Sequence, residues 1–379
     1  GESYIADVGS DHLRNVIAKD CLEATTDHKR LKELDALCVC VPTPLTKTKD
    51  PDLSYVTKES EEISEHLQRG QLIVLESTTY PGTTQEVVLP ILERSGLKAG
   101  LDFYLAYSPE RVDPGNKKHA IRNTPKIVGG INPESTRLAE LLYRHIVDAV
   151  IPVSSSKVAE MTKVFENVFR SVNIALVNEL AQLCEKMGIS VWEVIDAAST
   201  KPFGYMPFRP GPGVGGHCIP VDPYYLANKA KEYDFHTRFI ELAAEINEHM
   251  PYYITSRIMD ALNAQGKSLS KAKVLVLGVT YKGDVADIRE SPALHLLELL
   301  LDKGAQVSYN DPYIHKVEFP KQTLTSQELS EECLASMDCV VIGTDHGCYD
   351  WEQIASQAKL VFDTRGVTKA LRHSNIIRL

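Results

Sequence analysis

Residues 54–92 read SYVTKESEEISEHLQRGQLIVLESTTYPGTTQEVVLPIL and contain the alternation that decides the fold. Residues 54–67 and 84–92 have the spacing of amphipathic helices, and the apolar run 72–75 between them has the length of a buried strand. Further strands of this kind are predicted at 37–41 and 127–128. Strands that alternate with helices predict parallel βαβ units in an open, doubly wound α/β sheet.

Residues 153–262 show a different pattern, in which long helices replace the alternation. Apolar side chains recur twice at helical spacing, and we predict that each stripe faces a core. The first stripe comprises Val158, Met161, Phe165, Val168, Val172, Ala175, Leu180 and Leu183. The second comprises Phe239, Leu242, Ile246, Met250, Ile254, Ile258 and Leu262, with Pro251 as an expected kink. Residues 201–222 are rich in Gly and Pro, and an irregular loop of this length is usually functional.

A second α/β region begins at the apolar run 273–278. The predicted helices are 293–301 and 326–335, and the predicted strands are 307–309, 339–342 and 360–362. We therefore expect an α/β domain over 1–152, a helical connector with the irregular loop over 153–265, and a second α/β domain over 266–379.

The composition excludes several classes of protein. The chain has 379 residues, of which 43% are hydrophobic and 24% charged, as in globular proteins. A net charge of −10 and the lack of a long Lys/Arg block argue against binding to nucleic acids or to anionic membranes. The mean hydropathy is −0.17, and no apolar run reaches the length of about 18 residues that a spanning helix needs. Eight cysteines without a CxxC pair suit reduced thiols, so we expect a cytoplasmic protein without a secretory signal.

Residues 211–223, GPGVGGHCIPVDP, form the strongest local feature. Their glycines match the GxGxxG fingerprint, but their prolines interrupt the helix that the fingerprint requires, so we reject the match. Glycines let the backbone approach a ligand closely, and they leave the thiol of Cys218 unshielded. We expect this thiol to be a nucleophile, because nearby positive charge or backbone N–H dipoles can favour its thiolate. A buried structural role suits Cys38, Cys40, Cys184 and Cys339 better, since they lie in apolar runs. Adjacent His217 and Cys218 lack the ligand spacing of a zinc site, and no metal is expected.

Two polar segments follow predicted strands of the first α/β region. They are 41–44 (VPTP) and 76–84 (ESTTYPGTT). Open α/β sheets bind ligands at the carboxyl ends of their strands, although the hydroxyls could equally cap a helix. Residues 108–113 (SPERVD) add a carboxylate and a guanidinium in a loop after another strand.

Two further segments carry charges. Glu160, Lys163, Asn167 and Arg170 fall on one stripe of the first long helix, and spacing alone favours a solvated face. Residues 281–292 (YKGDVADIRESP) follow the strand that opens the second α/β region. The lysine that a P-loop requires is replaced by Asp284, which excludes an ATPase of that kind. Basic residues between a strand and a helix suit a diphosphate.

Together these segments resemble the UDP-glucose/GDP-mannose dehydrogenase family along essentially the whole chain. The motifs are VPTP (41–44), EST (76–78), SPER (108–111), AEMTK (159–163), GGHC (215–218), and YK with RES (281–282 and 289–291). The family oxidises C6 of nucleotide sugars twice with NAD. The resemblance therefore implies an oxidoreductase with two Rossmann-like domains, the first binding NAD and the second a UDP-sugar. It also implies a role in polysaccharide biosynthesis and a homodimer, or a higher homo-oligomer, formed through the central helices.

The resemblance also implies roles for individual residues. Cys218 resembles the family nucleophile, and Lys163 resembles the lysine that acts on the C6 oxygen. Thr78 and Glu110 are expected to hold the hydrolytic water, with Asp113 as an alternative to Glu110, and Asp222 is expected to orient groups near it. The expected substrate contacts are Arg111, Val112, Asn167, Arg170, Arg209, Gly215, Tyr281, Lys282 and Arg365. The expected NAD contacts are Thr43, Ser77, Thr78 and Arg289.

The sequence departs from the family at its start. The family opens with a strand and a glycine-rich turn that binds the NAD pyrophosphate, whereas this sequence begins at a segment that resembles a later helix-to-strand region. We therefore expect the first domain to lack its opening βα unit, and the chain as printed to bind a UDP-sugar more tightly than NAD.

A second departure concerns the sugar. The UDP-glucose branch tends to read Gly-Gly-Ser-Cys, whereas His217 precedes Cys218 here, and 217–223 resembles the N-acetylhexosamine branch. Residues 201–205 lack the His/Arg pair of the N-acetylmannosamine enzymes, so UDP-N-acetylglucosamine is the first choice of substrate. UDP-glucose and UDP-N-acetylmannosamine 6-dehydrogenases are the alternatives. A catalytically silent nucleotide-sugar-binding protein is another, although such a protein needs neither Cys218 nor Lys163.

Overall fold

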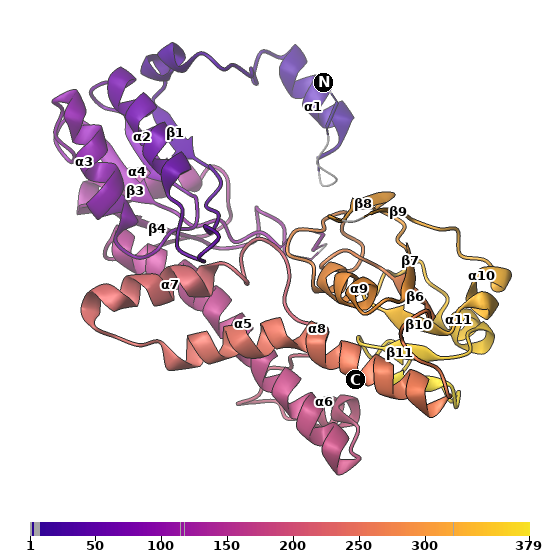
Figure 1. The fold of residues 1–379 in the computed structure, drawn as a ribbon. Coiled ribbons are helices and arrows are strands. Elements are labelled where there is room, and N and C mark those ends of the chain that lie inside the picture. The colour runs from indigo at the N-terminus through magenta and orange to yellow at the C-terminus, as the bar shows by residue number, and fades with distance from the viewer. Residues whose placement is uncertain (1, 4–7, 114, 117, 321) are drawn as a thin grey trace. The chain divides into compact units, whose positions relative to one another are not determined.

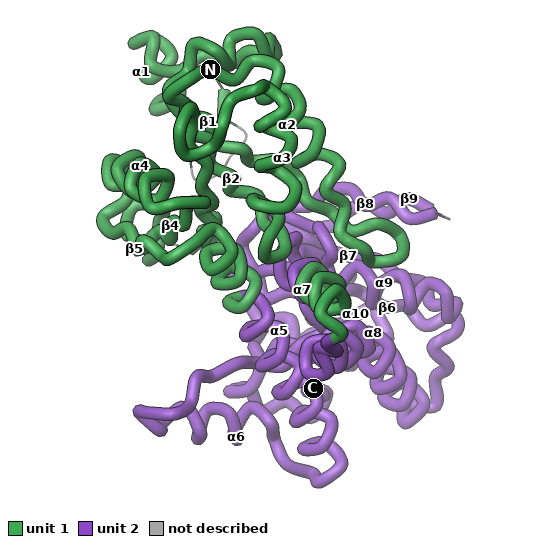
Figure 2. The backbone as a smooth tube through the Cα atoms, turned by 90° about the vertical axis from the view of Figure 1, so that its left-hand side faces the viewer, with its two compact units in different colours: residues 1–166, 224–234 green, residues 167–223, 235–379 purple. Residues whose placement is uncertain are grey.

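The computed structural model describes residues 2–3, 8–113, 115–116, 118–320 and 322–379, and the chain forms two compact units (Figure 2). Unit 1 comprises residues 1–166 and 224–234, and unit 2 comprises residues 167–223 and 235–379. The boundaries at 166/167 and 223/224 fall inside helices α5 (Ser156–Met187) and α7 (Asp222–Ala230). The division into three domains stays a prediction.

A five-stranded sheet lies at the centre of unit 1 (Figure 1). Its strands, in spatial order, are β1 (Ala36–Val39), β2 (Leu72–Leu75), β3 (Tyr104–Tyr107), β4 (Lys126–Gly130) and β5 (Val150–Pro152). Three of the four neighbouring pairs are parallel, but β3 and β4 are antiparallel, with Ala106 opposite Gly130. The described residues between β3 and β4 contain no helix, and an antiparallel pair needs no helical crossover. The expectation of a wholly parallel first sheet is wrong at this pair.

Helices cover both faces of this sheet. On one face, α2 (Ser54–His66), the π-helical turn η2 (Thr84–Val88) and α3 (Leu89–Leu92) pack against β1, β2 and β3. On the other face, α4 (Pro133–Tyr143) packs against β2, β3 and β4. The other helical elements of unit 1 are α1 (Ser10–Ala18), η1 (His28–Glu33), η3 (Glu93–Ser95) and η4 (Lys231–Tyr233). The predicted helix 54–67 and strand 72–75 are confirmed. The predicted helix 84–92 is helical but consists of a π-helical turn, η2, followed by an α-helical turn, α3.

Unit 2 contains a wholly parallel sheet in the order β12-β11-β10-β6-β7. Its strands are β6 (Lys273–Leu277), β7 (Gln306–Asn310), β10 (Cys339–Ile342), β11 (Val361–Asp363) and β12 (Ile376–Arg378). Helices α8 (Arg238–Ala264) and α9 (Pro292–Asp302) cover one face, and α10 (Glu331–Ser336) and α11 (Trp351–Gln357) cover the other. A hairpin of β8 (Lys316–Glu318) and β9 (Thr323–Thr325) follows β7. Because β7 and β10 flank β6, the strand order reverses between β6 and β10, and doubly wound sheets bind ligands at such a point.

The predicted helix 326–335 begins five residues too early. Helix α10 starts at Glu331, and the Ser330 hydroxyl accepts a hydrogen bond from Cys333 N at its first turn. Upstream, the Ser326 hydroxyl accepts from Asp311 N and donates to Asp311 O, which holds this residue beside the end of β7. Serine competes with helical structure through side-chain bonds of this kind.

Helix α5 buries the stripe that spacing favours as solvated. Glu160, Lys163 and Asn167 are buried, whereas Met161 and Phe165 of the predicted apolar stripe are exposed, Phe165 by 62%. Glu160 is held in place because its carboxylate accepts hydrogen bonds from Gly82 N (2.6 Å), Thr84 N (2.8 Å) and Thr84 Oγ1 (2.7 Å). The predicted core face is therefore wrong for much of α5. In α8 the stripe is buried from Met250 to Leu262 but exposed at Phe239 and Leu242.

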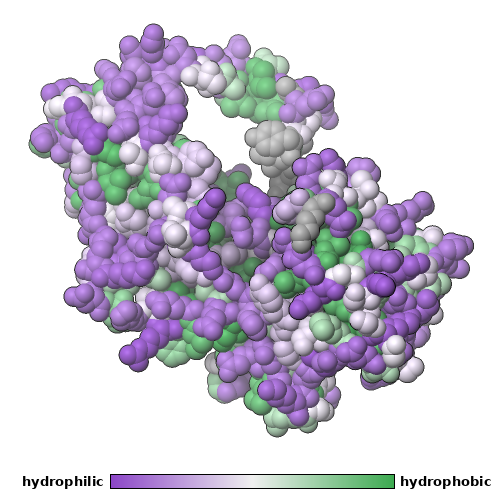
Figure 3. All heavy atoms as spheres, viewed as in Figure 1, coloured by the Kyte–Doolittle hydropathy of each residue, from purple (hydrophilic) through white to green (hydrophobic). Residues whose placement is uncertain are grey.

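The surface of the described residues is mixed. Figure 3 shows hydrophilic side chains over much of one face, with hydrophobic side chains between them. No helix in the described part of the chain is long and apolar enough to cross a membrane.

Candidate functional site

The glycine-rich loop before Cys218 packs directly on the segment that follows β6. A Cβ on Gly215 would lie 2.6 Å from Tyr281 Cβ, 2.7 Å from Glu290 O and 2.8 Å from Pro292 Cδ, so only glycine fits there. Gly216 has a φ of +86°, in the left-handed region, and its N–H donates to Arg289 O at 3.0 Å. Predicted residues Gly215, Tyr281 and Arg289 therefore lie side by side in unit 2.

Cys218 lies in the turn that leads into α7. Its carbonyl accepts hydrogen bonds from Val221 N (3.0 Å) and Asp222 N (2.8 Å). Its thiol is half-buried, and Sγ lies 2.7 Å from Nδ1 of His217. Cys184 and Cys339 are buried as expected, but Cys38 and Cys40 are exposed because β1 is an edge strand of the described sheet. Cys218 thus has a polar setting that the buried cysteines lack.

The start of α7 is tied to α5 through Asp222 and Asn167. Both side chains are buried, and Asn167 Nδ2 donates a hydrogen bond to Asp222 Oδ2. This bond joins two residues that the sequence placed in one site. Arg170, one turn further along α5, is exposed instead.

Lys163 lies one helical turn before Asn167 on α5, on the same face. Its exposed fraction is 9%, and its ammonium forms neither a hydrogen bond nor an ion pair within the described part of the chain. Buried lysines are almost always paired. An unpaired ammonium at this position suits a group that has a partial or full negative charge and comes from a ligand.

A half-buried arginine with a buried Nη2 atom marks the carboxyl end of the sheet in unit 2. Arg365 Nε donates to Gly343 O at 2.8 Å, and Nη1 lies close enough to Gly211 that a Cβ there would be 3.1 Å away. Nη2 is buried and has no hydrogen-bond partner among the described residues. Burial lowers the pKa of Arg365. An orphaned donor of this kind fits an anionic ligand.

A buried histidine and aspartate support the same sheet edge. His346 Nδ1 accepts a hydrogen bond from Asp284 N (3.0 Å), so Nε2 carries the proton and donates to Asp311 at 3.1 Å. Although burial acts to raise it, the hydrogen bonds from His346, Val279 N and Tyr313 N hold the pKa of Asp311 below its ordinary value. The pair connects the end of β7 to the loop after β10.

At the sheet edge of unit 1, two neighbouring hydroxyls have different roles. Ser77 Oγ accepts from Val41 N (2.8 Å) and donates to Val41 O (2.7 Å), which fixes the loop that contains Thr43. Thr79 is fully buried, and its Oγ1 has no hydrogen-bond partner within the described residues. Sequence reasoning chose Thr78, which is half-buried, and missed Thr79. Two consecutive threonines after a buried strand were the available signal.

Glu110 belongs to a charged cluster that the sequence did not reveal. Lys126 Nζ lies 2.8 Å from Glu76 Oε2 and 3.5 Å from Glu110 Oε2, and Tyr143 donates to Glu76 Oε1 at 2.5 Å. The side chains of Lys126 and Glu76 are only 10% and 12% exposed. Glu110 Oε1 also accepts from Arg111 N and Val112 N, both at 2.7 Å. The only sequence signal for Lys126 was a charged residue at the start of an apolar strand.

Three of the predicted contact arginines form ion pairs. Arg111 makes a bidentate pair with Glu166, with its shorter contact at 2.6 Å. The other two pairs are Arg209 with Asp196 (2.9 Å) and Arg289 with Asp287 (2.6 Å). A ligand phosphate bound at any of these arginines would have to share the guanidinium with a carboxylate of the protein. Their roles, like those of Val112, Tyr281 and Lys282, stay predictions.

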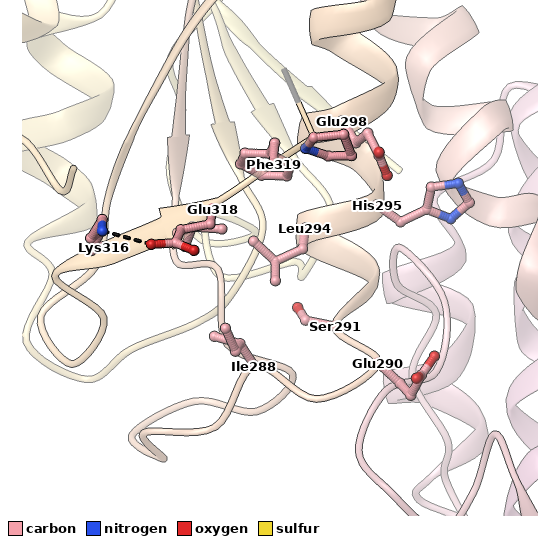
Figure 4. Close-up of a pocket in the computed structure, with 11 residues that line it drawn as sticks. Ile288, Glu290, Ser291, Leu294, His295, Glu298, Lys316, Glu318 and Phe319 are labelled. Carbon is pink, nitrogen blue, oxygen red and sulfur yellow. Dashed lines mark hydrogen bonds and ion pairs between the residues drawn. The ribbon is translucent and has the colours of Figure 1, made fainter. Parts of the chain in front are cut away.

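A pocket of about 610 Å³ lies in unit 2 between the start of α9 and β8 (Figure 4). Apolar side chains such as Leu294 and Phe319 line it together with Glu290, Glu298 and Glu318. Three carboxylates make it a poor site for a diphosphate. Among the described residues, no group of three His, Cys, Asp or Glu side chains is placed to hold a metal ion.

Three family models match consecutive parts of the chain. The NAD binding domain of the UDP-glucose/GDP-mannose dehydrogenase family matches residues 1–147, its central domain matches 157–249, and its UDP binding domain matches 275–370. The chain belongs to this family. The dehydrogenase is 37% identical to a UDP-N-acetyl-D-mannosamine dehydrogenase of Methanococcus maripaludis, over 89% of this chain and 77% of that protein. It is 38% identical to a UDP-N-acetyl-D-glucosamine 6-dehydrogenase of Pseudomonas aeruginosa, over 90% and 79%.

A solved structure supports the same fold. A UDP-D-ManNAc dehydrogenase from Pyrococcus horikoshii matches with a TM-score of 0.89 and 35% identity, covering 100% of this chain and 88% of that one. The resemblance derived from the motifs is thereby confirmed, together with NAD as the cofactor and a nucleotide-sugar 6-dehydrogenase activity class.

The residues at both sheet edges fit these two ligands. In the dehydrogenase, the NAD binding domain contains the edge at which Thr79 has an orphaned hydroxyl, and a dinucleotide offers polar groups to satisfy it. The UDP binding domain contains the reversal point of the second sheet and Arg365, whose orphaned Nη2 suits a diphosphate.

Proposed function

We propose that this dehydrogenase oxidises C6 of a UDP-N-acetylhexosamine in two steps to the uronate, with UDP-N-acetylglucosamine as the favoured substrate. The observation that carries the proposal is the setting of Cys218. Its half-buried thiol follows a loop whose glycines pack on the Tyr281–Pro292 segment of the UDP binding domain. A thiol beside a nucleotide-sugar domain allows an aldehyde to be captured covalently and then oxidised again.

In the first oxidation, C6 loses a hydride and its hydroxyl loses a proton. NAD, when bound, accepts the hydride. A water molecule beside Lys163 receives the hydroxyl proton while the ammonium stabilises negative charge that develops on O6, or else Lys163 receives the proton itself as the neutral amine. Asn167 and Asp222, joined by their hydrogen bond, hold the start of α7 in a fixed position relative to this face of α5.

In the second oxidation, Cys218 adds to the aldehyde as a thiolate and forms a thiohemiacetal, which keeps the reactive carbonyl from escaping. Loss of a second hydride gives a thioester. A water molecule held by Thr78 and by Glu110 or Asp113 then hydrolyses the thioester to the uronate. Lys126 supports this step by holding the carboxylate of Glu110, and Thr79 offers a second hydroxyl at the same edge.

The sugar is inferred from two observations. His217 and residues 201–205 favour the N-acetylhexosamine branch and, within it, N-acetylglucosamine over N-acetylmannosamine. Relatives of both specificities are nearly equal in identity, so identity does not choose between them.

NADH formation with a panel of UDP-sugars tests the proposal. We expect UDP-N-acetylglucosamine to give the highest kcat/KM and two NADH for each uronate formed. A higher kcat/KM for UDP-N-acetylmannosamine or UDP-glucose would overturn the assignment of the sugar. Binding of UDP-N-acetylglucosamine without any NADH would instead indicate a silent binding protein.

We also propose that the protein is a homodimer formed through α5. The helix exposes an apolar stripe that includes Met161, Phe165, Leu176 and Met187. At 1.5 Å per residue the stripe extends over about 39 Å. Monomers usually expose apolar side chains singly, so a continuous stripe of this kind suits an interface. Light scattering should give a dimer mass, and Phe165→Glu with Leu176→Glu should reduce it to one chain. Leu101→Glu, which removes an exposed leucine outside the stripe, is the matched control.

A further inference from the structure

His217 directly precedes Cys218 in the sequence, and its ring is placed to act on the thiol. The 2.7 Å distance between Nδ1 and Sγ of Cys218 is within hydrogen-bond reach. His217 is exposed and Cys218 is half-buried.

The charges around the pair have the right signs for proton transfer from sulfur to nitrogen. Asp287 lies near His217: burial acts to raise the pKa of Asp287, but hydrogen bonds from Arg289 lower it, and His217 acts in the same direction. Arg289 lies near Cys218. The pKa of Arg289 is raised mainly by its hydrogen bond to Asp287, and Tyr281 and Cys218 raise it further. A carboxylate therefore lies near the ring and a guanidinium near the sulfur, and the two also form an ion pair with each other.

We propose that His217 is a catalytic residue, the base that takes the Cys218 proton and makes the nucleophile a thiolate–imidazolium pair. This inference rests on the proposed function, in which Cys218 is the nucleophile. An ordinary thiol has a pKa of about 8.5 and is mostly protonated at neutral pH, whereas an imidazole of pKa about 6.5 beside it can share the proton. Thiols paired with histidine in this way are held as thiolates.

The proton and electron pairs balance through the cycle. The Sγ–H bond breaks and an Nδ1–H bond forms. The sulfur lone pair then forms the C6–Sγ bond, the C6–O6 π pair moves to O6, and the imidazolium proton neutralises O6. In the second oxidation C6 loses a hydride, which NAD would accept when bound, the O6 proton leaves to solvent, and the C6–O6 double bond forms again. On hydrolysis, water adds to the thioester carbonyl and the C6–Sγ pair returns to sulfur. Of the two protons released from water, one goes to Nδ1 and the other to solvent.

The rate at which iodoacetamide alkylates Cys218, followed by peptide mass spectrometry across pH without substrate, tests the pair directly. His217→Gln keeps a polar side chain but cannot titrate. At pH of about 6.5 an unpaired thiol is about 1% thiolate and a paired one about half, while each paired thiolate is about tenfold less nucleophilic. We therefore expect the wild type to react about fivefold faster than the variant at that pH.

At a pH of about 9.5 the order should reverse, with the variant about tenfold faster, because both thiols are then ionised and the unpaired one is the stronger nucleophile. A crossing of the two profiles is not expected from a merely structural role. Exposed Cys348 in the same digest is the internal reference, and His315→Gln, which removes another exposed imidazole, is the matched control. The pH profile for alkylation of Cys348 should be the same in wild type and His217→Gln, and His315→Gln should leave the profile of Cys218 unchanged.

The inference would be overturned if the alkylation rate of Cys218 had its midpoint at the same pH in wild type and in His217→Gln. That result is independent of the proposed function, which depends on whether Cys218→Ser still makes uronate. If the inference holds, His217→Gln should also lower kcat for uronate formation at neutral pH and regain most of it at alkaline pH.

Discussion

The carboxyl edges of the two sheets differ in how their buried polar groups are satisfied. In unit 1, Lys126, Glu76 and Tyr143 bind one another and Ser77 binds the backbone of Val41, so that most of the buried polar groups there are satisfied, with Thr79 Oγ1 as an exception among the described residues. In unit 2, Arg365 is half-buried, and its Nη2 is buried and unsatisfied among the described residues, beside Gly211 of the glycine-rich loop. Satisfied groups mainly hold the sheet edge in shape, whereas orphaned groups mark positions where a ligand completes the bonding. Mutations at the two edges should therefore differ in whether stability or activity is lost.

The largest effect should come from Cys218→Ser. A serine alkoxide cannot replace the thiolate at neutral pH, so the complete oxidation to uronate should be abolished. Trace aldehyde or a slow adduct is compatible with this role. Uronate would be measured by mass spectrometry, and turnover near the wild-type rate would contradict the covalent mechanism.

Lys126→Met should mainly destabilise the protein. Removing one partner of a buried pair leaves Glu76 uncompensated and should lower the free energy of unfolding by about 3 kcal/mol. Denaturant unfolding measures this loss. Arg69→Met breaks an exposed ion pair with Asp102 in the same unit and is the control, for which less than about 1 kcal/mol is expected. Equal losses in the two variants would contradict the buried cluster's role in holding the edge.

Lys163→Ala should reduce kcat by about 10² or more while changing UDP-sugar affinity less, because a positioned proton-transfer group is lost. Steady-state kinetics separates the two quantities. If KM rises while kcat stays constant, Lys163 binds substrate and does not act on the C6 oxygen. The unfolding free energy should stay constant or rise, since the buried ammonium has no partner within the described residues.

Arg365→Lys should weaken UDP-sugar binding about tenfold with little change in stability, because a lysine cannot reproduce the second donor of the guanidinium. Calorimetry with UDP gives the affinity. Arg372→Lys, at an exposed position of the same unit, is the matched control. A large loss of stability with unchanged affinity would assign Arg365 to the fold and weaken the contrast between the two edges.

Asp311→Asn should have the smallest effect, and the effect should depend on pH. Because the pKa of Asp311 is lowered on folding, its charge stabilises the native state above the ordinary aspartate value of about 3.9, and this contribution is lost as pH falls through the folded value. We expect a loss of about 1 kcal/mol at neutral pH that diminishes in acid. Thermal unfolding across pH measures it, and a difference independent of pH would contradict the role of the charge.

Much of the fold could be predicted from the sequence. Apolar runs of strand length located β2, β6 and β10, because a strand buried on both faces must be apolar throughout. The loop of Cys218 was also identifiable, since glycines and prolines in that density cannot form regular structure. The antiparallel pairing of β3 and β4 could not be predicted from the sequence, because the apolar content of a strand does not depend on the direction of its neighbour.

The sequence by itself determined the alternation of strands and helices in the two α/β regions, the irregular glycine-rich loop that contains Cys218 and, through six ordered motifs, the family. Only the tertiary structure decided which face of α5 is buried. Spacing reports where apolar side chains recur along a helix, and it favoured Phe165 over Glu160. Glu160 is buried because Gly82 and Thr84 donate to its carboxylate, and Asn167 because Asp222 accepts from its amide. These partners lie far away in sequence, so the bonds that make burial of a polar stripe favourable exist only once the chain has folded.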